Sequence, residues 1–299
     1  MKAEPVLAVY AGYSLKGMHV NPGADLEPFV QEALEEIEYV VGDTNTKWGA
    51  QRAKDGHPAP FNLHYVEIGN EDWFDKSKSY DARFVQFDDA IKARYPQLKT
   101  ISTIGNDQPE AMRVHSRKPD MTDEHYYRSV EEFLRMSPNY AQKYPRSGPE
   151  IFVGEWAAYE TAFVPWDGRS RNEPPTPNFR AAIGDAVFMA AMERNSDLIL
   201  MQCYAPLFVN VNPGARQWRP DCIGYDAISA YGSPSYYAFQ VFSRNLGDQI
   251  LSTVSADTAV QGCATRSTRS GEIFLKLVNP LATAESLKID LKGIAGVNA

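Results

Sequence analysis

The sequence has 299 residues, which is enough for one large domain or two ordinary ones. Apolar residues make up 43% of it and charged residues 23%, as in globular proteins that bury a sizeable core. The formal net charge is −8 and no basic patch stands out, which argues against nucleic acid as a partner. No apolar stretch approaches the ~20 residues that span a bilayer, so we predict no membrane partner.

Targeting and metal-binding signals are not visible in the sequence. The start of the chain has no secretory signal, so localisation is left open, with a secreted or periplasmic parent protein as one alternative. The three cysteines are far apart, and neither they nor the histidines have the spacing of metal ligands. We therefore predict no metal and no cofactor. The oligomeric state is not predicted.

In chain order, short apolar runs alternate with stretches of helical periodicity. The apolar runs predict six strands, at residues 5–12, 64–68, 99–104, 121–127, 150–156 and 198–204. The periodic stretches predict helices at residues 26–41, 81–94, 130–144, 179–194 and 236–244. Apolar strands that are nearly all followed by a helix indicate an α/β protein with a parallel sheet covered on both faces.

Two α/β architectures compete for this pattern, a doubly wound open sheet and a (β/α)₈ barrel. The segment Ala11-Gly12-Tyr13-Ser14, after the first strand, lacks the glycine-rich turn of dinucleotide-binding folds. This disfavours a dinucleotide-dependent oxidoreductase. Polar residues instead follow several different strands, as in a barrel. Because six strands are too few to close it, we predict an incomplete (β/α)₈ TIM barrel of about six βα units.

The pattern of apolar residues along the sequence changes after about residue 247. Helical periodicity ends, and four β-rich runs follow at residues 250–254, 259–265, 272–278 and 286–291. We expect these runs to open a C-terminal β-sandwich domain that the chain does not complete. The predicted division is therefore a partial catalytic barrel at 1–247 and a truncated β-domain at 248–299.

Two glutamates end predicted strands, Glu71 in VEIGNEDW and Glu155 in FVGEW. In a parallel barrel all carboxyl ends of the strands open onto one face, so these two side chains are expected to meet there. Glycoside hydrolysis requires such a pair of carboxyl groups on either side of the scissile bond. The alternative, two solvated loop glutamates, explains either residue alone better than it explains the pair.

The chain resembles glycoside hydrolase family 51, the α-L-arabinofuranosidases. The Asn70-Glu71 pair is similar to the acid/base signature of the larger clan of retaining glycosidases. Several stretches narrow the resemblance to the family: PVLAVYAGYSL, YVEIGNEDWF, FVGEWAAY, YAPLFVNVNPGARQWRPDCIGYD and YGSPSYYAFQVFSRN. They cover nearly the whole chain in order. The resemblance implies that strands three to eight of the barrel are present and that two earlier strands are missing.

The resemblance also implies catalytic roles for residues of this chain. Glu71 is expected to be the acid/base and Glu155 the nucleophile of a retaining hydrolase that releases terminal α-L-arabinofuranosyl groups. Asn70 matches a residue that bonds the sugar 2-hydroxyl. Tyr127 matches a tyrosine that positions the nucleophile, although the neighbouring Tyr126 is an alternative.

Four further residues are candidates for binding the sugar. Gln217 matches a family glutamine that contacts it. Trp73 and Trp156 either line the pocket or fill the core. His125 either bonds near the nucleophile or is a satisfied core histidine. The expected partner is an arabinose-containing oligo- or polysaccharide.

Two alternative functions remain open. Another retaining glycosidase of the same clan, such as an endo-glucanase or a β-xylosidase, would carry the same Asn-Glu pair. Because the chain is truncated, the other alternative is an inactive carbohydrate-binding fragment. We also predict that the chain alone folds poorly, since an unclosed parallel barrel exposes two sheet edges.

Overall fold

The computed structural model describes residues 3–15, 17–142, 144–160, 174–215, 219–254 and 259–293. The chain divides into two compact units. The first unit contains Met1–Tyr127, Lys143–Ala157 and Ser196–Ala205. The second contains Arg128–Gln142, Ala158–Asn195 and Pro206–Ala299.

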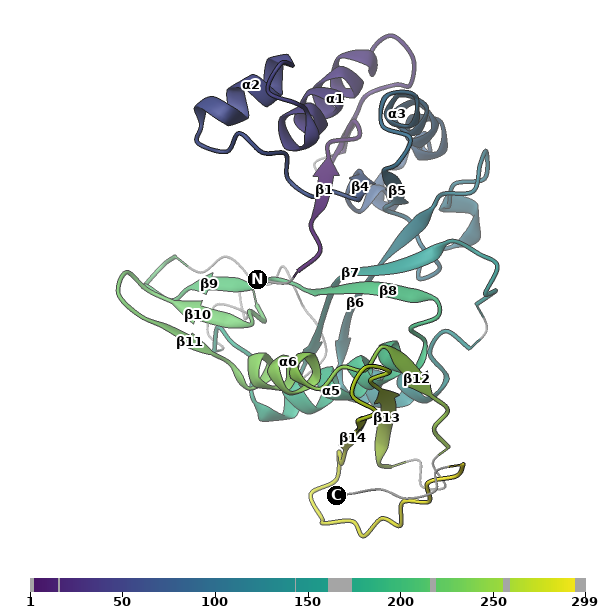
Figure 1. Ribbon diagram of the computed structural model, residues 1–299, viewed down its shortest axis with the longest axis vertical. Coiled ribbons are helices and arrows are strands. Elements are labelled where there is room, and N and C mark those ends of the chain that lie inside the picture. The colour runs from purple at the N-terminus through teal and green to yellow at the C-terminus, as the bar shows by residue number, and fades with distance from the viewer. Residues whose placement is uncertain are drawn as a thin grey trace. The chain divides into compact units, whose positions relative to one another are not determined.

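A six-stranded sheet forms the frame of the first unit (Figure 1). Its strands follow the order β1-β4-β5-β6-β7-β8, and the β1–β4, β4–β5, β5–β6 and β7–β8 pairings are parallel. All six predicted strands are confirmed, and the sheet is that of an incomplete (β/α)₈ barrel. The strands are β1 (Val6–Val9), β4 (Tyr65–Ile68), β5 (Lys99–Ser102), β6 (Met121–Ser129), β7 (Glu150–Tyr159) and β8 (Ile199–Tyr204).

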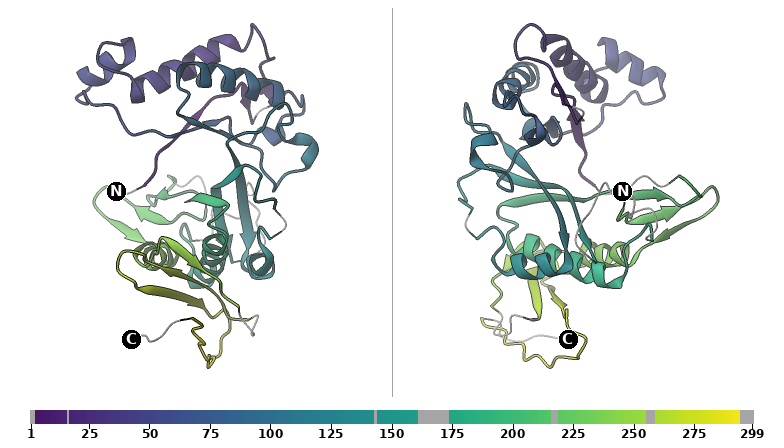
Figure 2. Two further views of the ribbon diagram at one scale, coloured as in Figure 1. Left: turned by 45° about the vertical axis from the view of Figure 1, so that its right-hand side comes forward. Right: turned by 180° about the vertical axis from the view of Figure 1, so that it is seen from behind.

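Helices α1 (Glu27–Val41) and α3 (Tyr80–Arg94) lie beside the β1–β4–β5 part of this sheet in both Figure 1 and Figure 2. Their apolar side chains form one buried cluster with those of β1 and β4. A second, smaller cluster joins Ile101, Met121 and Phe152. Because side chains alternate along a strand, the two clusters lie on opposite faces of the sheet.

The sequence prediction missed several short elements of the first unit. Helix α2 (Lys47–Lys54) is too polar to have an apolar periodicity, but Thr46 caps it by accepting a hydrogen bond from the Gly49 N–H. The other short elements are β2 (Tyr13–Ser14), β3 (Met18–His19), η1 (Asp72–Phe74) and η2 (Glu110–Met112).

The second unit contains helices and two small sheets. Helices α4 (Val130–Met136), α5 (Phe179–Arg194) and α6 (Pro234–Arg244) agree in position with three predictions. The sheet of β9, β10 and β11 was not predicted, whereas β12, β13 and β14 match the first three β-rich runs. The remaining elements of this unit are η3 (Ser137–Asn139), β9 (Phe208–Asn210), β10 (Ile223–Tyr225), β11 (Ala230–Gly232), β12 (Gln249–Leu251), β13 (Gln261–Arg266) and β14 (Ile273–Val278).

One predicted helix of this unit was too long, and one predicted strand is absent. The helix predicted at 130–144 ends at Met136, because Pro138 has no N–H to donate to the Leu134 carbonyl. The side chain of Gln261 donates to that carbonyl instead, at 3.1 Å. The predicted strand at 286–291 has no regular structure. Residues of this run are exposed, so no packing favours a strand there.

The C-terminal strands contact α5 within the second unit. Lys276 of β14 forms a 2.6 Å ion pair with Glu193, and both side chains are mostly buried. The predicted domain division at residue 248 stays a prediction. Among the described residues, no helix combines the length and apolar character that crossing a membrane requires.

Candidate functional site

Glu71 lies in a sharp turn directly after β4. Gly69 has a φ of 97° and Glu71 a φ of 54°, so two residues of the turn are left-handed. The Asn70 N–H donates to Asp72 Oδ2 at 3.0 Å, and the Glu71 N–H donates to Thr103 Oγ1 at 2.9 Å. A left-handed conformation is unusual for a glutamate, and such strain is typical of functional positions.

The buried Arg83 of α3 holds this turn in place. Its guanidinium donates to Asp72 Oδ1 at 2.7 Å and to Asp75 Oδ2 at 2.8 Å, and it also bonds the Ala11 carbonyl. Burial raises the pKa of Asp72 to about 6, although the Arg83 charge opposes this shift. One arginine therefore ties the turn that carries Glu71 to the chain after β1.

Glu155 projects from β7 beside a second well-anchored carboxylate, that of Asp123. The Gly154 N–H donates to Asp123 Oδ1 at 2.7 Å. A Cβ atom at Gly154 would lie 2.4 Å from that same oxygen, so only glycine fits there. The glycine that precedes Glu155 thus makes room for a carboxylate of β6.

The two candidate carboxylates converge on His125 of β6. The His125 Nδ1 atom lies 3.0 Å from Glu71 Oε1 and 3.5 Å from Glu155 Oε2, and one oxygen of each glutamate lies within 4.8 Å of the other. The Tyr127 hydroxyl donates to Glu155 Oε2 at 2.6 Å. Tyr126 instead donates to Glu124, so of the two tyrosines Tyr127 contacts Glu155.

Burial and neighbouring charges have opposing effects on the pKa values of Glu155 and His125. Burial raises the pKa of Glu155, and the nearby Glu71 charge adds to this, whereas His125 and the Tyr127 hydrogen bond lower it. Burial disfavours a charged His125, but the charge and hydrogen bond of Asp123 and the bond to Glu71 outweigh it and raise its pKa well above the usual value. The raised pKa favours the imidazolium form of His125, which can donate to carboxylates from both ring nitrogens.

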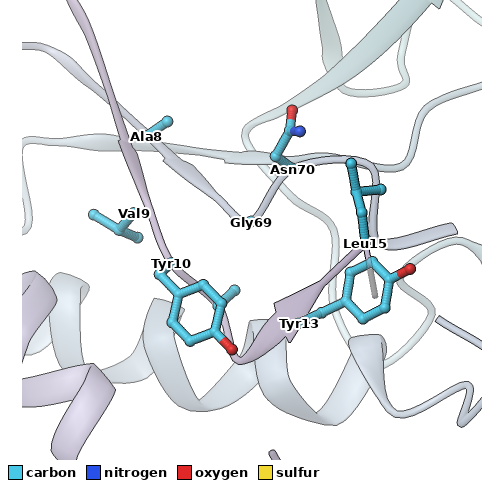
Figure 3. A pocket seen from close by; sticks show the side chains of 8 residues that line it. Ala8, Val9, Tyr10, Tyr13, Leu15, Gly69 and Asn70 are labelled. Carbon is cyan, nitrogen blue, oxygen red and sulfur yellow. The ribbon is translucent and has the colours of Figure 1, made fainter. Parts of the chain in front are cut away.

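Asn70 is exposed and lines a cavity of ≈ 250 Å³ within the first unit. Figure 3 shows this cavity with Tyr10 and Tyr13 from the segment after β1 and with Gly69 and Asn70 from the turn after β4. Burial raises the pKa of Tyr13, and the charges of the Glu71 turn raise it further.

The three remaining candidates have different surroundings. Trp73 is half-buried, and its ring meets that of His125 edge-on with 5.1 Å between the centroids. Trp156 is 0% exposed and donates from Nε1 to Gln202 Oε1 at 2.7 Å, so the core alternative describes it and the pocket alternative does not. Gln217 lies outside the described residues.

Ligand atoms of Glu71, His125 and Glu155 lie close enough together to surround a metal ion. Both nitrogens of His125 are already engaged, however, with Glu71 on one side and with Asp123 at 2.7 Å on the other. We assign no metal ligand here, and the absence of a metal stays a prediction.

Sequence reasoning missed the residues that support the site, namely Asp123, Arg83 and the buried Glu67. Asp123 was within reach, because it lies two residues before His125 on a predicted strand and so shares its face. Arg83 and Glu67 had no local signal, since each interacts with residues of other elements.

Two family models together match nearly the whole chain. The α-L-arabinofuranosidase 1 domain matches residues 1–146, and the α-L-arabinofuranosidase C-terminal domain matches residues 154–299. α-L-Arabinofuranosidase 2 of Arabidopsis thaliana is 35% identical over 89% of this chain and 37% of its own length. α-L-Arabinofuranosidase A of Aspergillus kawachii is 36% identical over 97% of this chain and 44% of its own length. The chain thus spans less than half the length of these relatives.

Solved structures are similar as well. An arabinose-bound MgGH51 α-L-arabinofuranosidase is 36% identical and has a TM-score of 0.83, over 94% of this chain and 44% of that one. The α-L-arabinofuranosidase of Thermotoga maritima is 19% identical and has a TM-score of 0.63, over 84% of this chain and 58% of that one. At 19% identity, the similarity to the Thermotoga maritima structure supports the fold and nothing further.

Proposed function

Because this chain belongs to the α-L-arabinofuranosidases of glycoside hydrolase family 51, we propose that the whole protein is a retaining hydrolase. It releases terminal non-reducing α-L-arabinofuranosyl groups. The substrate class is arabinose-containing oligo- and polysaccharides of plant origin. The names of the similar proteins support this substrate class.

The observation that carries the proposal is the convergence of Glu71 and Glu155 on His125, with one oxygen of each within 4.8 Å of the other. Retaining glycosidases hold their two carboxyl groups about 5–5.5 Å apart, whereas inverting ones leave about 6.5–9.5 Å for a water molecule. The short separation therefore supports a double displacement.

In the first step of the proposed mechanism, a carboxylate oxygen of Glu155 forms a bond to the anomeric carbon of arabinose. The glycosidic C–O bond breaks, and Glu71 transfers its proton to the departing oxygen. In the second step Glu71 accepts a proton from water, and that water displaces Glu155 from the sugar. Two inversions at the same carbon retain its configuration.

The surroundings of Glu155 suit a nucleophile. The Tyr127 hydroxyl and the His125 cation both favour its ionised form, which the attack requires. Asn70, at the edge of the cavity in Figure 3, is our candidate for bonding the sugar 2-hydroxyl. Gln217 and Trp73 are further candidate sugar contacts.

Single substitutions at the two glutamates test the mechanism. With p-nitrophenyl α-L-arabinofuranoside as substrate, Glu155→Gln is expected to lower kcat at least about 1,000-fold. Glu71→Gln should be rescued in part by azide, because a small nucleophile needs no base in the second step. The control is Glu32→Gln, at an exposed position of α1, which should leave kcat unchanged.

Near-normal turnover by Glu155→Gln would refute the mechanism. A panel of aryl glycosides distinguishes the alternative glycosidases, because an endo-glucanase or a β-xylosidase would prefer glucosides or xylosides. Arabinose-oligosaccharide binding without turnover by the unmodified chain would indicate a carbohydrate-binding fragment.

A further inference from the structure

Glu67 is a buried carboxyl group that the proposed mechanism does not use. It lies on β4, is 7% exposed, and its Oε1 atom is buried with no hydrogen-bond partner. In the register of the sheet, Glu67 pairs with Ile101, which in turn pairs with Met121. Residues paired across parallel strands point to the same face, so Glu67 shares the face of this apolar row.

The next layer on that face is Asp123, two residues beyond Met121 on β6, and His125 lies two residues further. Glu67 therefore lies beneath the catalytic pair, between an apolar row and a charged layer. Asp123 is 1% exposed and already accepts two hydrogen bonds, from the Gly154 N–H and from His125 Nε2, each at 2.7 Å.

Two ionised carboxyl groups in successive buried layers of one sheet face are costly, since neither is solvated and they repel each other. Burial raises the pKa of Glu67 well above its usual value, and the charge and hydrogen bond of Asp123 raise it further. The His125 charge opposes this shift only in part. The neutral acid resolves the conflict, because it carries a proton that Asp123 can accept.

We propose that Glu67 is a positioning residue which, as the neutral acid, donates a hydrogen bond to Asp123 and so holds that carboxylate against His125. The chain of contacts then runs from Glu67 through Asp123 and His125 to Glu71. Glu67 touches no reacting atom. It acts on the catalytic pair through the imidazolium, whose orientation depends on Asp123.

Other titratable groups interact electrostatically with Glu67, from both faces of the sheet. Glu155 of β7 raises the pKa of Glu67, and Glu67 in turn is among the charges that raise the pKa values of Cys203 on β8 and Tyr80 on α3. Of the main groups that shift the pKa of Glu67, His125 lowers it, whereas Asp123 and Glu155 raise it. Ionised Glu67 would therefore add a further negative charge beneath a site that already holds Glu155 and Asp123.

Two variants separate the neutral acid from the alternatives. Glu67→Gln keeps the shape and an N–H donor for Asp123 but cannot ionise. Glu67→Met keeps the length but has no donor. The readouts are the imidazole resonances of His125 in the NMR spectrum of the full chain, assigned by their loss in a His125→Gln variant, and the melting temperature.

In Glu67→Gln the pKa of His125 should change by less than about half a unit, because no charge is lost. A fall of about one unit or more would overturn the proposal, because it would mean that Glu67 is ionised in the native protein. In Glu67→Met the Nε2–H proton of His125 should shift and exchange faster with water. An unchanged Nε2–H resonance in Glu67→Met would also overturn it.

A kinetic experiment adds a second test, which rests on the proposed function. Glu67→Met should lower kcat on the aryl arabinofuranoside about tenfold, or about 1.4 kcal/mol, with KM changed less than about twofold. Glu67→Gln should restore most of the lost kcat. Equal losses in both variants would count against positioning through a donor. If the unmodified chain is inactive, the proposed function is in question, but the NMR outcomes still decide the role of Glu67.

Discussion

At the scale of single residues, the ionisation of Glu155 depends on opposing surroundings. Burial and the Glu71 charge raise its pKa, whereas His125 and the Tyr127 hydroxyl lower it. A nucleophile must be ionised to attack, so the donors beside Glu155 set the lowest pH at which the proposed reaction proceeds. The adjacent Tyr126 donates to Glu124, so we assign it no role in the ionisation of Glu155.

We expect Tyr127→Phe to raise the pKa of Glu155, because the carboxylate loses a 2.6 Å hydrogen bond. The acidic limb of the kcat/KM profile should then move to higher pH, and the loss of activity should be greatest at low pH. The matched control is Tyr126→Phe, whose profile should keep its acidic limb. An acidic limb that moves equally in both variants would contradict the assignment.

Gly69 shows how one backbone position shapes the Glu71 turn. A Cβ atom there would lie 2.2 Å from Asp72 Oδ2, and the φ of 97° is unfavourable for other residues. Gly56 has a φ of 101° but no atom within 4 Å of its Cβ position. Both glycines therefore need a left-handed backbone conformation, but only Gly69 also lacks space for a Cβ atom.

Both glycine-to-alanine substitutions should lower the free energy of unfolding by about 1 kcal/mol through the left-handed conformation. Gly69→Ala should cost more and should also lower kcat, because the Asp72 carboxylate that fixes Asn70 must move. Urea unfolding and steady-state kinetics measure the two effects. Equal stability and equal activity of Gly69→Ala and Gly56→Ala would contradict this account.

At the scale of elements, helix α3 contributes more to the site than an apolar face. Arg83 is fully buried and bonds two aspartates of the turn that precedes the helix, as well as the Ala11 carbonyl. Removing one partner of a buried ion pair leaves the other charge unpaired and unsolvated. Arg94, on the same helix, has a 44% exposed side chain and pairs with Glu38, whose side chain is 8% exposed and also accepts a hydrogen bond from the Trp48 N–H.

We expect Arg83→Met to lower the free energy of unfolding by about 3–5 kcal/mol, whereas Arg94→Met should lower it by about 1 kcal/mol or less. The pKa of Asp72, already about 6, should rise further without the arginine. Protonation then stabilises the folded variant at low pH, so its stability deficit should grow as pH rises through that pKa. Denaturant unfolding at pH 5 and pH 8 measures this. A deficit independent of pH would contradict the role of Asp72.

At the scale of the whole molecule, β1 and β8 are the outer strands of the sheet among the described residues. Their outer edges present backbone groups that another strand could pair with, which favours aggregation. The chain also covers only 44% of a similar solved structure, measured by that structure's length.

We therefore expect the isolated 299-residue chain to unfold over a broad temperature range and to aggregate on heating. Circular dichroism melting with light scattering measures both. A sharp and reversible transition would show that the two units are stable as they stand and would contradict this expectation.

Particular elements show how far sequence reasoning reached. Strands β1, β4, β7 and β8 were predictable because they contain short apolar runs, and α5 was predicted at the observed bounds. The error at 130–144 came from apolar spacing that continues past Pro138, where the backbone cannot stay helical. The error at 286–291 came from β-propensity without packing partners, which does not suffice for a strand.

Local pattern and spacing by themselves determined the parallel sheet, the two glutamates at strand ends and the family resemblance, because each depends on neighbours in the chain. Only the tertiary structure decided that Tyr127 bonds Glu155, that His125 joins both glutamates, that Trp156 is buried and that Glu67 lies beneath Asp123. Those contacts join residues of different strands and helices. Their distances depend on strand order and register, which no local pattern specifies.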